Sequence, residues 1–410
     1  MMKTLLVLAR GDLKSFHTIN GQSIFQDLPF KTVLLVDRGN QKQLAQLAGN
    51  LELVTVRWSD EDALKQTVAQ LHQQHQFCGV ATVDESNVSL AAELRAQLNL
   101  TGMQPAQAEW FRDKVKMKAQ LQPFNIRVPL FCECQDKAQV TAILKQFGQI
   151  VIKPRAGFGS KQVTFVSHPQ ELDAWYQENS NEIQHYEAEE FIDGQLFHVN
   201  ALVIDGQTRL TAAAAYLPGM SNVDFSAGTP FVSVIVEDEQ LRNRLIAFSD
   251  QVNQAFELQN GVTHLECFVT EKQEIVFCEV GLRPGGGGIV WMIESQYGIN
   301  YSQAVIALEA NEAQLIAQPI DKPNNLSGLI GIRSNLSGFI TQTAHNDDFS
   351  DEQIRLKHIA VDVGNFKAAS AHCTDFLGLF IFDALNHAHF EQTWRSINEK
   401  FQEKLILNCI

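Results

Sequence analysis

The sequence predicts a protein of mixed α/β and α+β class, in which a parallel α/β domain is followed by a region of paired strands. Two observations carry this prediction. Apolar strand-type runs alternate with helical segments in the N-terminal part, and Gly-rich or Asp-Gly turns separate strand pairs further along the chain. At 410 residues the chain exceeds one ordinary domain, so two or three packed lobes are expected.

The N-terminal part alternates strands with helices. Apolar periodicity predicts strands over Thr4–Leu8, Thr32–Val36, Leu51–Val56 and Phe77–Val83, and helices over Ala63–Gln74 and Asn87–Leu98. This alternation implies a parallel sheet whose ligand-facing edge lies at the carboxyl ends of the strands, where Asp84 and Glu85 follow the fourth strand. Because no G-x-G-x-x-G follows the first strand, the sequence does not indicate a nicotinamide-binding Rossmann domain.

A Gly-rich hairpin marks the second region, which begins after the break at Thr101 to Pro105. The strand Gln149–Lys153 runs into the turn Pro154–Ser160, and the chain returns along Gln162–Val166. In a P-loop the glycines open a helix, whereas here they form a hairpin tip that can cover a nucleotide as a lid. The neighbouring predicted elements are a strand, Leu130–Cys132, and helices over Asp113–Leu121, Val140–Phe147 and Pro169–Asn179.

Two further strand pairs are predicted downstream. Glu187–Ile192 is predicted to pair with Leu196–Ile204 around an Asp-Gly turn, and Val262–Val269 is predicted to pair with Glu274–Val280. The glycine run from Gly285 to Gly288 then leads into a helix. The tail is predicted to contain strands Gly328–Arg333, Gly338–Thr341 and Leu377–Phe382, and a last helix over Phe390–Lys404.

Composition argues against several classes of protein. The net charge of −15 argues against a general nucleic-acid binder, because the phosphate backbone attracts basic surfaces. No apolar run reaches the roughly 18 residues that span a bilayer, and the N-terminal apolar stretch is too short for a signal peptide, so a cytoplasmic protein is expected. The spacing of Cys132 and Cys134 is wrong for a zinc site, which makes structural thiols the expectation for the 7 cysteines.

Two glutamates on neighbouring strands are candidate metal ligands. Alternate residues of a strand face the same side, so Glu266 and Glu279 can project together from the second predicted hairpin. Converging carboxylates suit Mg²⁺, a hard cation that prefers oxygen ligands. Arg283 follows closely, where its guanidinium could hold a phosphate or carboxylate in a bidentate way. A pair of exposed strand glutamates with a surface arginine is the alternative.

The Gly-rich hairpin and the segment after it suggest a nucleotide site. Lys153 ends an apolar strand, so its ammonium would reach phosphates held by backbone N–H groups of the glycine tip. The segment Glu189 to Ile192 combines an apolar strand end with backbone donors and acceptors, which suits adenine. Each feature alone is weak evidence for a nucleotide site, because many strands end in lysine or carry acidic residues.

Taken in order, these segments resemble the ATP-grasp superfamily. Its pattern runs through a D-K helix, an I-K-P strand with a Gly-rich lid, an E-E hinge, a strand with a metal-binding Glu, and E-x-N-x-R-P. The matching segments are Asp113-Lys114, Ile152-Lys153-Pro154, Glu189 to Ile192, Leu265-Glu266-Cys267 and Glu279 to Pro284. The resemblance implies a pre-ATP-grasp α/β domain over residues 1–104, a small lobe with the lid over 105–192, and a large lobe with a β-rich extension over 193–410.

The resemblance also implies a role for each matching residue. ATP would bind with Mg²⁺, or with Mn²⁺ in its place, and Glu266 and Glu279 would ligate the metal. Arg283 and Lys153 would be the catalytic cations that stabilise the acyl phosphate or the transition state leading to it. The residues implied in ATP binding are Lys114, Lys153, Gly157, Gly159, Ser160, Glu189, Glu190, Phe191 and Ile192.

Two departures from the family pattern stand out. Gly281 occupies the position of the usual metal-binding Asn, so one ligand is missing or is supplied from elsewhere. Near the position of the usual ribose-contacting acid stand His198 and Asn200, and a satisfied structural histidine is the favoured interpretation there. The run E-x-G-x-R-P-G-G-G looks most like L-amino-acid ligases that make dipeptides, in which Gly286 and Gly287 would shape the pocket of the carboxylate substrate.

The implied activity is an ATP-dependent ligation of a carboxylate, expected to be an amino acid, to an amine, with release of ADP and phosphate. Glu85 is a candidate acid or base for the proton of the amine, with a charge that favours a helix N-terminus as the alternative. The expected partners are small-molecule substrates and a second copy of the chain as the common default. Two alternatives stay open: a biotin-carboxylase-like enzyme that uses bicarbonate, and a non-catalytic nucleotide-binding regulator.

Overall fold

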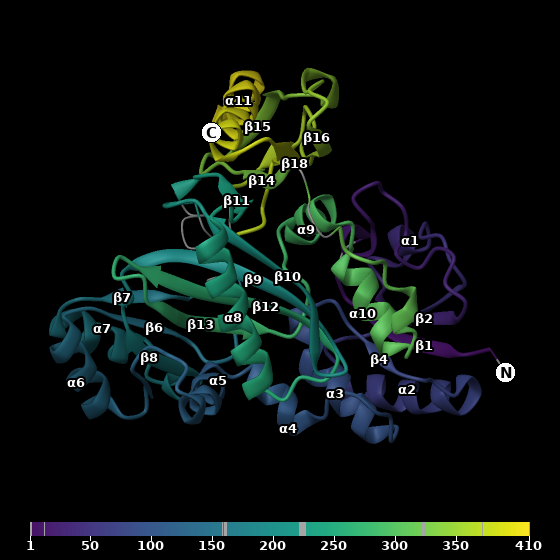
Figure 1. Cartoon of the computed structure of the whole chain (residues 1–410), viewed down its shortest axis with the longest axis horizontal. Coiled ribbons are helices and arrows are strands. Elements are labelled where there is room, and N and C mark those ends of the chain that lie inside the picture. The colour runs from purple at the N-terminus through teal and green to yellow at the C-terminus, as the bar shows by residue number, and fades with distance from the viewer. Residues whose placement is uncertain are drawn as a thin grey trace.

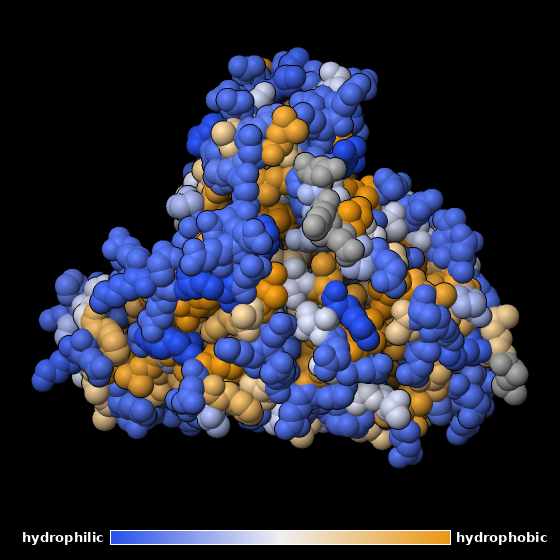
Figure 2. Space-filling view, in the orientation of Figure 1, coloured by the Kyte–Doolittle hydropathy of each residue, from blue (hydrophilic) through white to orange (hydrophobic). Residues whose placement is uncertain are grey.

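A computed structural model describes residues 2–11, 13–157, 159, 162–220, 227–320, 323, 325–370 and 372–409 of the chain. Three bodies surround a long central sheet: the N-terminal domain in purple and blue, the small lobe with α6 and α7, and a C-terminal body with α11 in yellow (Figure 1). In the space-filling view, hydrophobic residues gather where the C-terminal body meets the rest of the chain, while its outer top is almost entirely hydrophilic (Figure 2). Among the described residues, no helix combines the length and the apolar composition needed to cross a bilayer.

The N-terminal domain is built on a parallel sheet with the strand order β3-β2-β1-β4. Its two inner strands, β1 and β2, are almost continuously apolar, as expected for a parallel sheet that is covered on both faces. Its elements are β1 (Thr4–Ala9), β2 (Lys31–Asp37), α1 (Gln41–Leu44), β3 (Leu51–Val56), α2 (Glu61–His75), β4 (Val80–Ala81), α3 (Val88–Gln97) and α4 (Pro105–Ala108). The predicted parallel α/β arrangement is confirmed.

The fourth strand is shorter than the prediction of Phe77–Val83. Only Val80 and Ala81 pair with β1. The chain then turns because the side chain of Thr82 accepts a hydrogen bond from the backbone N–H of Asp84 at 3.1 Å. This turn places Glu85 at the start of a short 3-10 segment, at the carboxyl edge of the sheet.

The small lobe is an antiparallel sheet with the order β5-β8-β6-β7, covered by α6 and α7. Cys132 and Cys134 are buried in its core, and the predicted hairpin around the Gly-rich turn is confirmed as β6 and β7. The elements are α5 (Lys114–Leu121), which precedes the lobe, β5 (Phe131–Glu133), α6 (Lys137–Phe147), β6 (Ile150–Pro154), β7 (Thr164–Val166), α7 (Pro169–Glu178) and β8 (Tyr186–Glu190).

The prediction that the strand before Asp193-Gly194 pairs with the strand after it is wrong. The first, β8, pairs with β5 and β6 of the small lobe, whereas β9 (Gly194–Ile204) pairs with β10 and β12 of the central sheet. Gly194 is therefore explained by a close approach between strands, since a Cβ atom there would lie 2.9 Å from the carbonyl oxygen of Val269. The Asp-Gly dipeptide joins two sheets and is not a hairpin turn.

The central sheet has eight antiparallel strands in the order β13-β12-β9-β10-β11-β14-β18-β16. The hairpin of β12 and β13 is confirmed, whereas β10, β11, β16 and helix α8 were not predicted. The elements are β10 (Gln207–Tyr216), β11 (Phe231–Ile235), α8 (Glu239–Ala255), β12 (Gly261–Thr270), β13 (Ile275–Gly281), α9 (Ile289–Tyr297), α10 (Tyr301–Glu309), β14 (Leu326–Ile332), β16 (Ile354–Ile359) and β18 (Gly378–Ala384).

The C-terminal body adds a three-stranded sheet of β17 (Phe366–Lys367), β15 (Gly338–Gln342) and β19 (Ile406–Cys409). Helix α11 (His387–Lys404) packs on β14 and β18. One large apolar core joins β1 and β2 of the N-terminal domain to α9, α10 and the C-terminal half of the central sheet. The division of the chain at residues 104 and 192 stays a prediction.

Candidate functional site

Two neighbouring cavities share the side chain of Tyr216. The first, of about 620 Å³, lies between the small-lobe sheet and the hairpin of β12 and β13. The second, of about 480 Å³, lies between the N-terminal domain, the glycine run and the C-terminal body. The predicted site residues that line the first are Lys114, Lys153, Gly157, Glu189, Glu190, Phe191, Ile192, Glu266 and Glu279. Those that line the second are Glu85, Gly159, Arg283, Gly286 and Gly287; Ser160 lies outside the described residues.

The two candidate metal ligands stand opposite each other in the strand register. Glu266 on β12 pairs with Glu279 on β13, so both side chains project from the same face of the hairpin. The hydroxyl of Tyr216 donates to Glu266 Oε1 at 2.7 Å, and Lys114 Nζ lies 2.9 Å from Glu279 Oε2. Burial disfavours the charged carboxylate of Glu279, but the nearby ammonium groups of Lys114 and Lys153 lower its pKa to about 2.

A buried group of charges fixes the position of Lys153. Lys118 is fully buried, and its ammonium bonds both Glu187, at 2.7 Å, and Glu189. The opposite oxygen of Glu189 lies 2.5 Å from Lys153 Nζ. Burial disfavours the ammonium of Lys153, but the carboxylate of Glu189 and its neighbours raise its pKa well above the usual value. Lys153 is therefore held as a cation at the wall of the first cavity.

Lys114 connects the Gly-rich turn to the metal-ligand pair. Asp113 is the N-cap of helix α5, and its carboxylate accepts hydrogen bonds from the first-turn N–H groups. Lys114 follows, and its Nζ donates to the carbonyl oxygen of Gly157 at 2.8 Å. Gly159 lies on the other side of the turn, where a Cβ atom would be 3.1 Å from His372 of the C-terminal body. The two glycines thus face different cavities.

The segment after β8 gives the first cavity an apolar wall. Phe191 packs edge-on against Phe165 at 6.0 Å between ring centroids. The carboxylate of Glu190 is engaged by Arg127 and by the backbone N–H of Leu130, at 2.6 and 2.7 Å. The backbone N–H of Phe191 donates to the carbonyl of Gln149 at 3.3 Å, so this group does not contribute a donor to a ligand.

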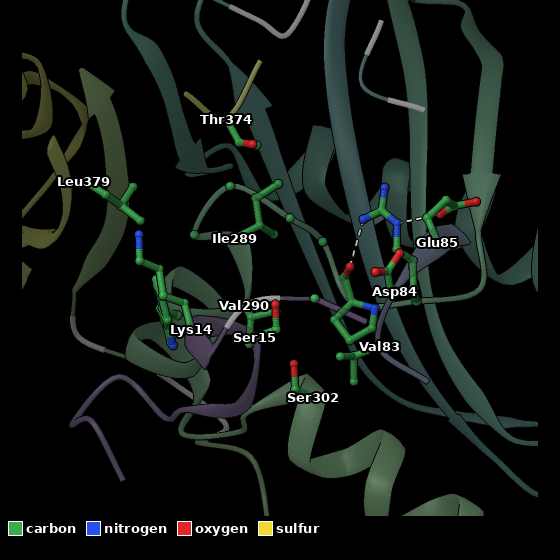
Figure 3. Close-up of a pocket in the computed structure, with 18 of the residues that line it drawn as sticks. Lys14, Ser15, Val83, Asp84, Glu85, Ile289, Val290, Ser302, Thr374 and Leu379 are labelled. Carbon is green, nitrogen blue, oxygen red and sulfur yellow. Dashed lines mark hydrogen bonds and ion pairs between the residues drawn. The ribbon is translucent and has the colours of Figure 1, made fainter. Parts of the chain in front are cut away.

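The second cavity has charged groups on two opposite sides and apolar residues among them. Figure 3 shows Asp84 and Glu85 on one flank and Lys14 on the opposite flank, with Ile289 between them and Leu379 above Lys14. Nε of Arg283 donates to Glu85 Oε2 at 2.5 Å, while Arg112 bonds the other oxygen of Glu85. Burial alone would lower the pKa of Arg283, but the carboxylate of Glu85 raises it.

His198 and Asn200 belong to a buried polar chain and line neither cavity. His198 bonds Ser233 Oγ at 2.7 Å and the amide nitrogen of Asn200 at 2.9 Å. The amide oxygen of Asn200 lies 2.8 Å from Nδ1 of His264. Burial, followed by the neighbouring His264, lowers the pKa of His198 well below 6.5. This geometry supports a satisfied structural histidine, and it does not support a ribose contact.

Comparisons with known proteins agree with this arrangement. A family model of the ATP-grasp N-terminal domain matches residues 30–102, and a model of the ATP-grasp domain matches residues 147–290. The chain belongs to the ATP-grasp superfamily. The predicted fold class and the predicted family are thereby confirmed.

Several relatives of this ATP-grasp chain are known. An L-arginine-specific L-amino acid ligase of Bacillus subtilis is 24% identical over 280 residues, which span 64% of this chain and 65% of that protein. An L-amino acid ligase from Bacillus licheniformis superposes with a TM-score of 0.78 at 20% identity, over 99% of both chains. A phosphoribosylglycinamide synthetase from Anaerococcus prevotii superposes with a TM-score of 0.75 at 17% identity, over 99% of this chain and 100% of that one.

Three residues of the ATP-grasp site were missed by the sequence analysis. Lys118 lies one helical turn after Lys114, so the i, i+4 spacing on α5 was an available signal. Arg112 directly precedes the D-K motif, but nothing local indicates that it reaches Glu85. Tyr216 ends β10, a strand that the sequence analysis did not find.

Proposed function

We propose that this ATP-grasp protein is a ligase that activates a carboxylate as an acyl phosphate and couples it to an amine, with release of ADP and orthophosphate. The observation that carries the proposal is the contact between the two cavities at Tyr216. The lysines and paired glutamates lie on one side of it, and Arg283 with the glycine run lies on the other. Two relatives are L-amino acid ligases, which supports an amino acid as the carboxylate substrate.

The first cavity fits a nucleotide with a divalent metal. Its volume of about 620 Å³ falls within the range of small-molecule sites. Phe191 and Ile192 offer an apolar wall for adenine, and Lys114 and Lys153 offer cations for the phosphates. Glu266 and Glu279 supply the oxygen donors that Mg²⁺ or Mn²⁺ prefers, although no group of three or more metal-ligating side chains is preassembled in the described part of the chain. Bound there, the metal would offset negative charge on the phosphates.

The residues around the shared wall fit phosphoryl transfer. A carboxylate oxygen in the second cavity attacks the γ-phosphorus, a new O–P bond forms, and the bond to ADP breaks. Lys153 and Arg283, on opposite sides of this wall, stabilise the negative charge of the transferring group. The amine then attacks the acyl carbon, orthophosphate leaves, and the amine nitrogen loses a proton.

The glycine run gives the substrate room beside Arg283. A Cβ atom at Gly286 would meet nothing within 4 Å, whereas one at Gly287 would lie 3.2 Å from the ring of Phe231. Both oxygens of Glu85 are engaged by arginines, so the structure favours a role for Glu85 in placing Arg283 over its predicted role as the base.

Turnover with defined products tests the proposal. The protein is incubated with ATP, Mg²⁺ and pairs of amino acids, and the nucleotide product, phosphate and product mass are measured. ADP and phosphate should form only when both substrates are present, together with a product whose mass equals their sum minus water. AMP as the main nucleotide product would contradict the mechanism. ADP release that depends on bicarbonate and biotin would favour the carboxylase alternative, and nucleotide binding without any turnover would favour the regulator.

A further inference from the structure

The position of Gly281, where the family usually has Asn, is filled from another part of the chain. Gly281 ends β13 two residues after Glu279. A Cβ atom built on Gly281 would lie 2.5 Å from Glu85 Oε2, which is closer than two such atoms can stand. The carboxylate of Glu85 therefore occupies the space in which a side chain at residue 281 would begin.

Backbone conformation does not explain the glycine at this position. Gly281 does not have a positive φ, and it lies in a strand whose backbone conformation any L-residue can adopt. Close approach is the remaining reason for glycine here. The glycine and the glutamate thus form a matched pair, since any larger residue at 281 displaces the carboxylate of Glu85.

Glu85 is firmly held in this space. It is only 7% exposed, and its two carboxylate oxygens accept hydrogen bonds from Arg112 and Arg283, one oxygen from each. The segment before it is fixed by Asp84, whose Oδ1 accepts from both the N–H and the hydroxyl of Ser86, at 2.9 and 2.8 Å. Arg283 receives a second restraint because its NH1 group donates to the carbonyl of Pro284 at 2.8 Å.

We propose that Glu85 is a positioning residue: it enters the space left open by Gly281 and fixes the guanidinium of Arg283 at the wall of the substrate cavity. This role rests on the proposed ligase function, in which Arg283 meets the transferring phosphoryl group. It gives the N-terminal domain an indirect part in catalysis, because Glu85 comes from the carboxyl edge of the parallel sheet while Arg283 follows the central sheet. A displacement of the guanidinium by about 1 Å is enough to lower turnover about a hundredfold.

A double-mutant cycle tests the pair. Glu85→Ala removes the carboxylate, and Gly281→Ala displaces it without removing it. Each variant should lower kcat about a hundredfold, while the KM for ATP stays within about twofold, because neither residue lines the nucleotide cavity. The double variant should be no slower than Glu85→Ala alone.

Two further variants serve as controls. Glu85→Gln, which can still accept a hydrogen bond from Arg283, should recover part of kcat. Glu93→Ala, which removes a surface carboxylate paired with Lys65 on the same domain, should keep the kcat of the unmodified protein.

The kcat values of the variants decide whether Glu85 positions Arg283. Losses of kcat that multiply in the double variant, or a Glu85→Ala enzyme with unchanged kcat, would overturn the inference. If the unmodified protein shows no turnover dependent on amino acids, the proposed function fails. The midpoint temperature of thermal unfolding then tests whether Glu85 and Gly281 compete for the same space. Gly281→Ala should lower this midpoint when Glu85 is present and leave it unchanged in the Glu85→Ala background. Equal effects in both backgrounds would show that the two residues do not compete for one space.

Discussion

Replacement of Lys118 by methionine tests the buried charges that hold Lys153. Lys118 has no solvent exposure and bonds both Glu187 and Glu189, which are themselves 0% and 4% exposed. Methionine keeps the length of the side chain and removes the charge, so two buried carboxylates would share Lys153, whose Nζ lies 3.9 Å from Glu187. Burial already raises the pKa of Glu187, and the loss of Lys118 would raise it further.

Loss of one partner from a buried ion pair costs about 3–5 kcal/mol, because the other charge stays buried without compensation. We expect Lys118→Met to lower the free energy of unfolding by this amount, which is a large share of the roughly 5–15 kcal/mol of a typical protein. Urea denaturation followed by circular dichroism measures it. Adding Glu187→Gln to Lys118→Met should recover a substantial part of the loss, since it removes one of the uncompensated charges.

Lys137→Met is the matched control. Lys137 pairs with Asp173 at 2.7 Å on the surface of the same lobe, and its side chain is 52% exposed. Exposed ion pairs contribute about 0–1 kcal/mol, so this variant should stay close to the unmodified protein. If Lys118→Met destabilises no more than Lys137→Met, the argument that the buried charges depend on Lys118 is refuted.

Three further predictions concern the site. Lys153→Ala should weaken ATP binding or turnover about a hundredfold, and unchanged values in a folded variant would remove Lys153 from the site. Glu266→Gln and Glu279→Gln should each weaken Mn²⁺ binding, measured by electron paramagnetic resonance with a non-hydrolysable ATP analogue, and full retention of binding by both would exclude the metal assignment. Burial opposes ionisation of Asp113, but the ion pair with Arg155 lowers the pKa of its carboxyl group in the folded protein. The ionised carboxylate therefore stabilises the fold at pH values above its unfolded pKa of about 3.9. This stabilisation is lost as the pH falls through the lower pKa of the folded protein. Asp113→Asn should therefore reduce stability at pH 7 and change it little at strongly acidic pH, and an equal loss at both would contradict the ionic origin.

The sequence was sufficient where the structure depends on neighbouring residues. The pairing of Glu266 with Glu279 follows from a hairpin with a short loop, so strand alternation alone puts both carboxylates on one face. The Gly-rich hairpin of β6 and β7 is local in the same way. The wrong pairing of β8 with β9 shows the limit: the two strands flank an Asp-Gly dipeptide, but their distant partners decide which sheet each joins.

Contacts between distant segments could not be predicted. The strand β10 contains a run of alanines, Ala212 to Ala215, which has weak strand propensity and is buried by its neighbours in the central sheet. Tyr216 was missed together with that strand. The contact of Glu85 with Arg112 and Arg283 joins segments that are 27 and 198 residues apart. No pattern in a single sequence predicts that Glu85 contacts these two arginines. The unusual glycine at position 281 was the one local sign of this contact.

The separation of the apolar cores determines how each cavity can change its width. Phe16, Tyr216, Phe231 and Ile289 line the second cavity and belong to the one large core that joins the N-terminal domain to the C-terminal half of the central sheet. These four residues therefore belong to one packed body, while Gly159 reaches the same cavity from the small lobe. The first cavity lies between two bodies with cores of their own, one inside the small lobe and one beside β12 and β13. We expect a rotation of the small lobe to open the first cavity without breaking either core, and to change the second cavity where Gly159 lines it.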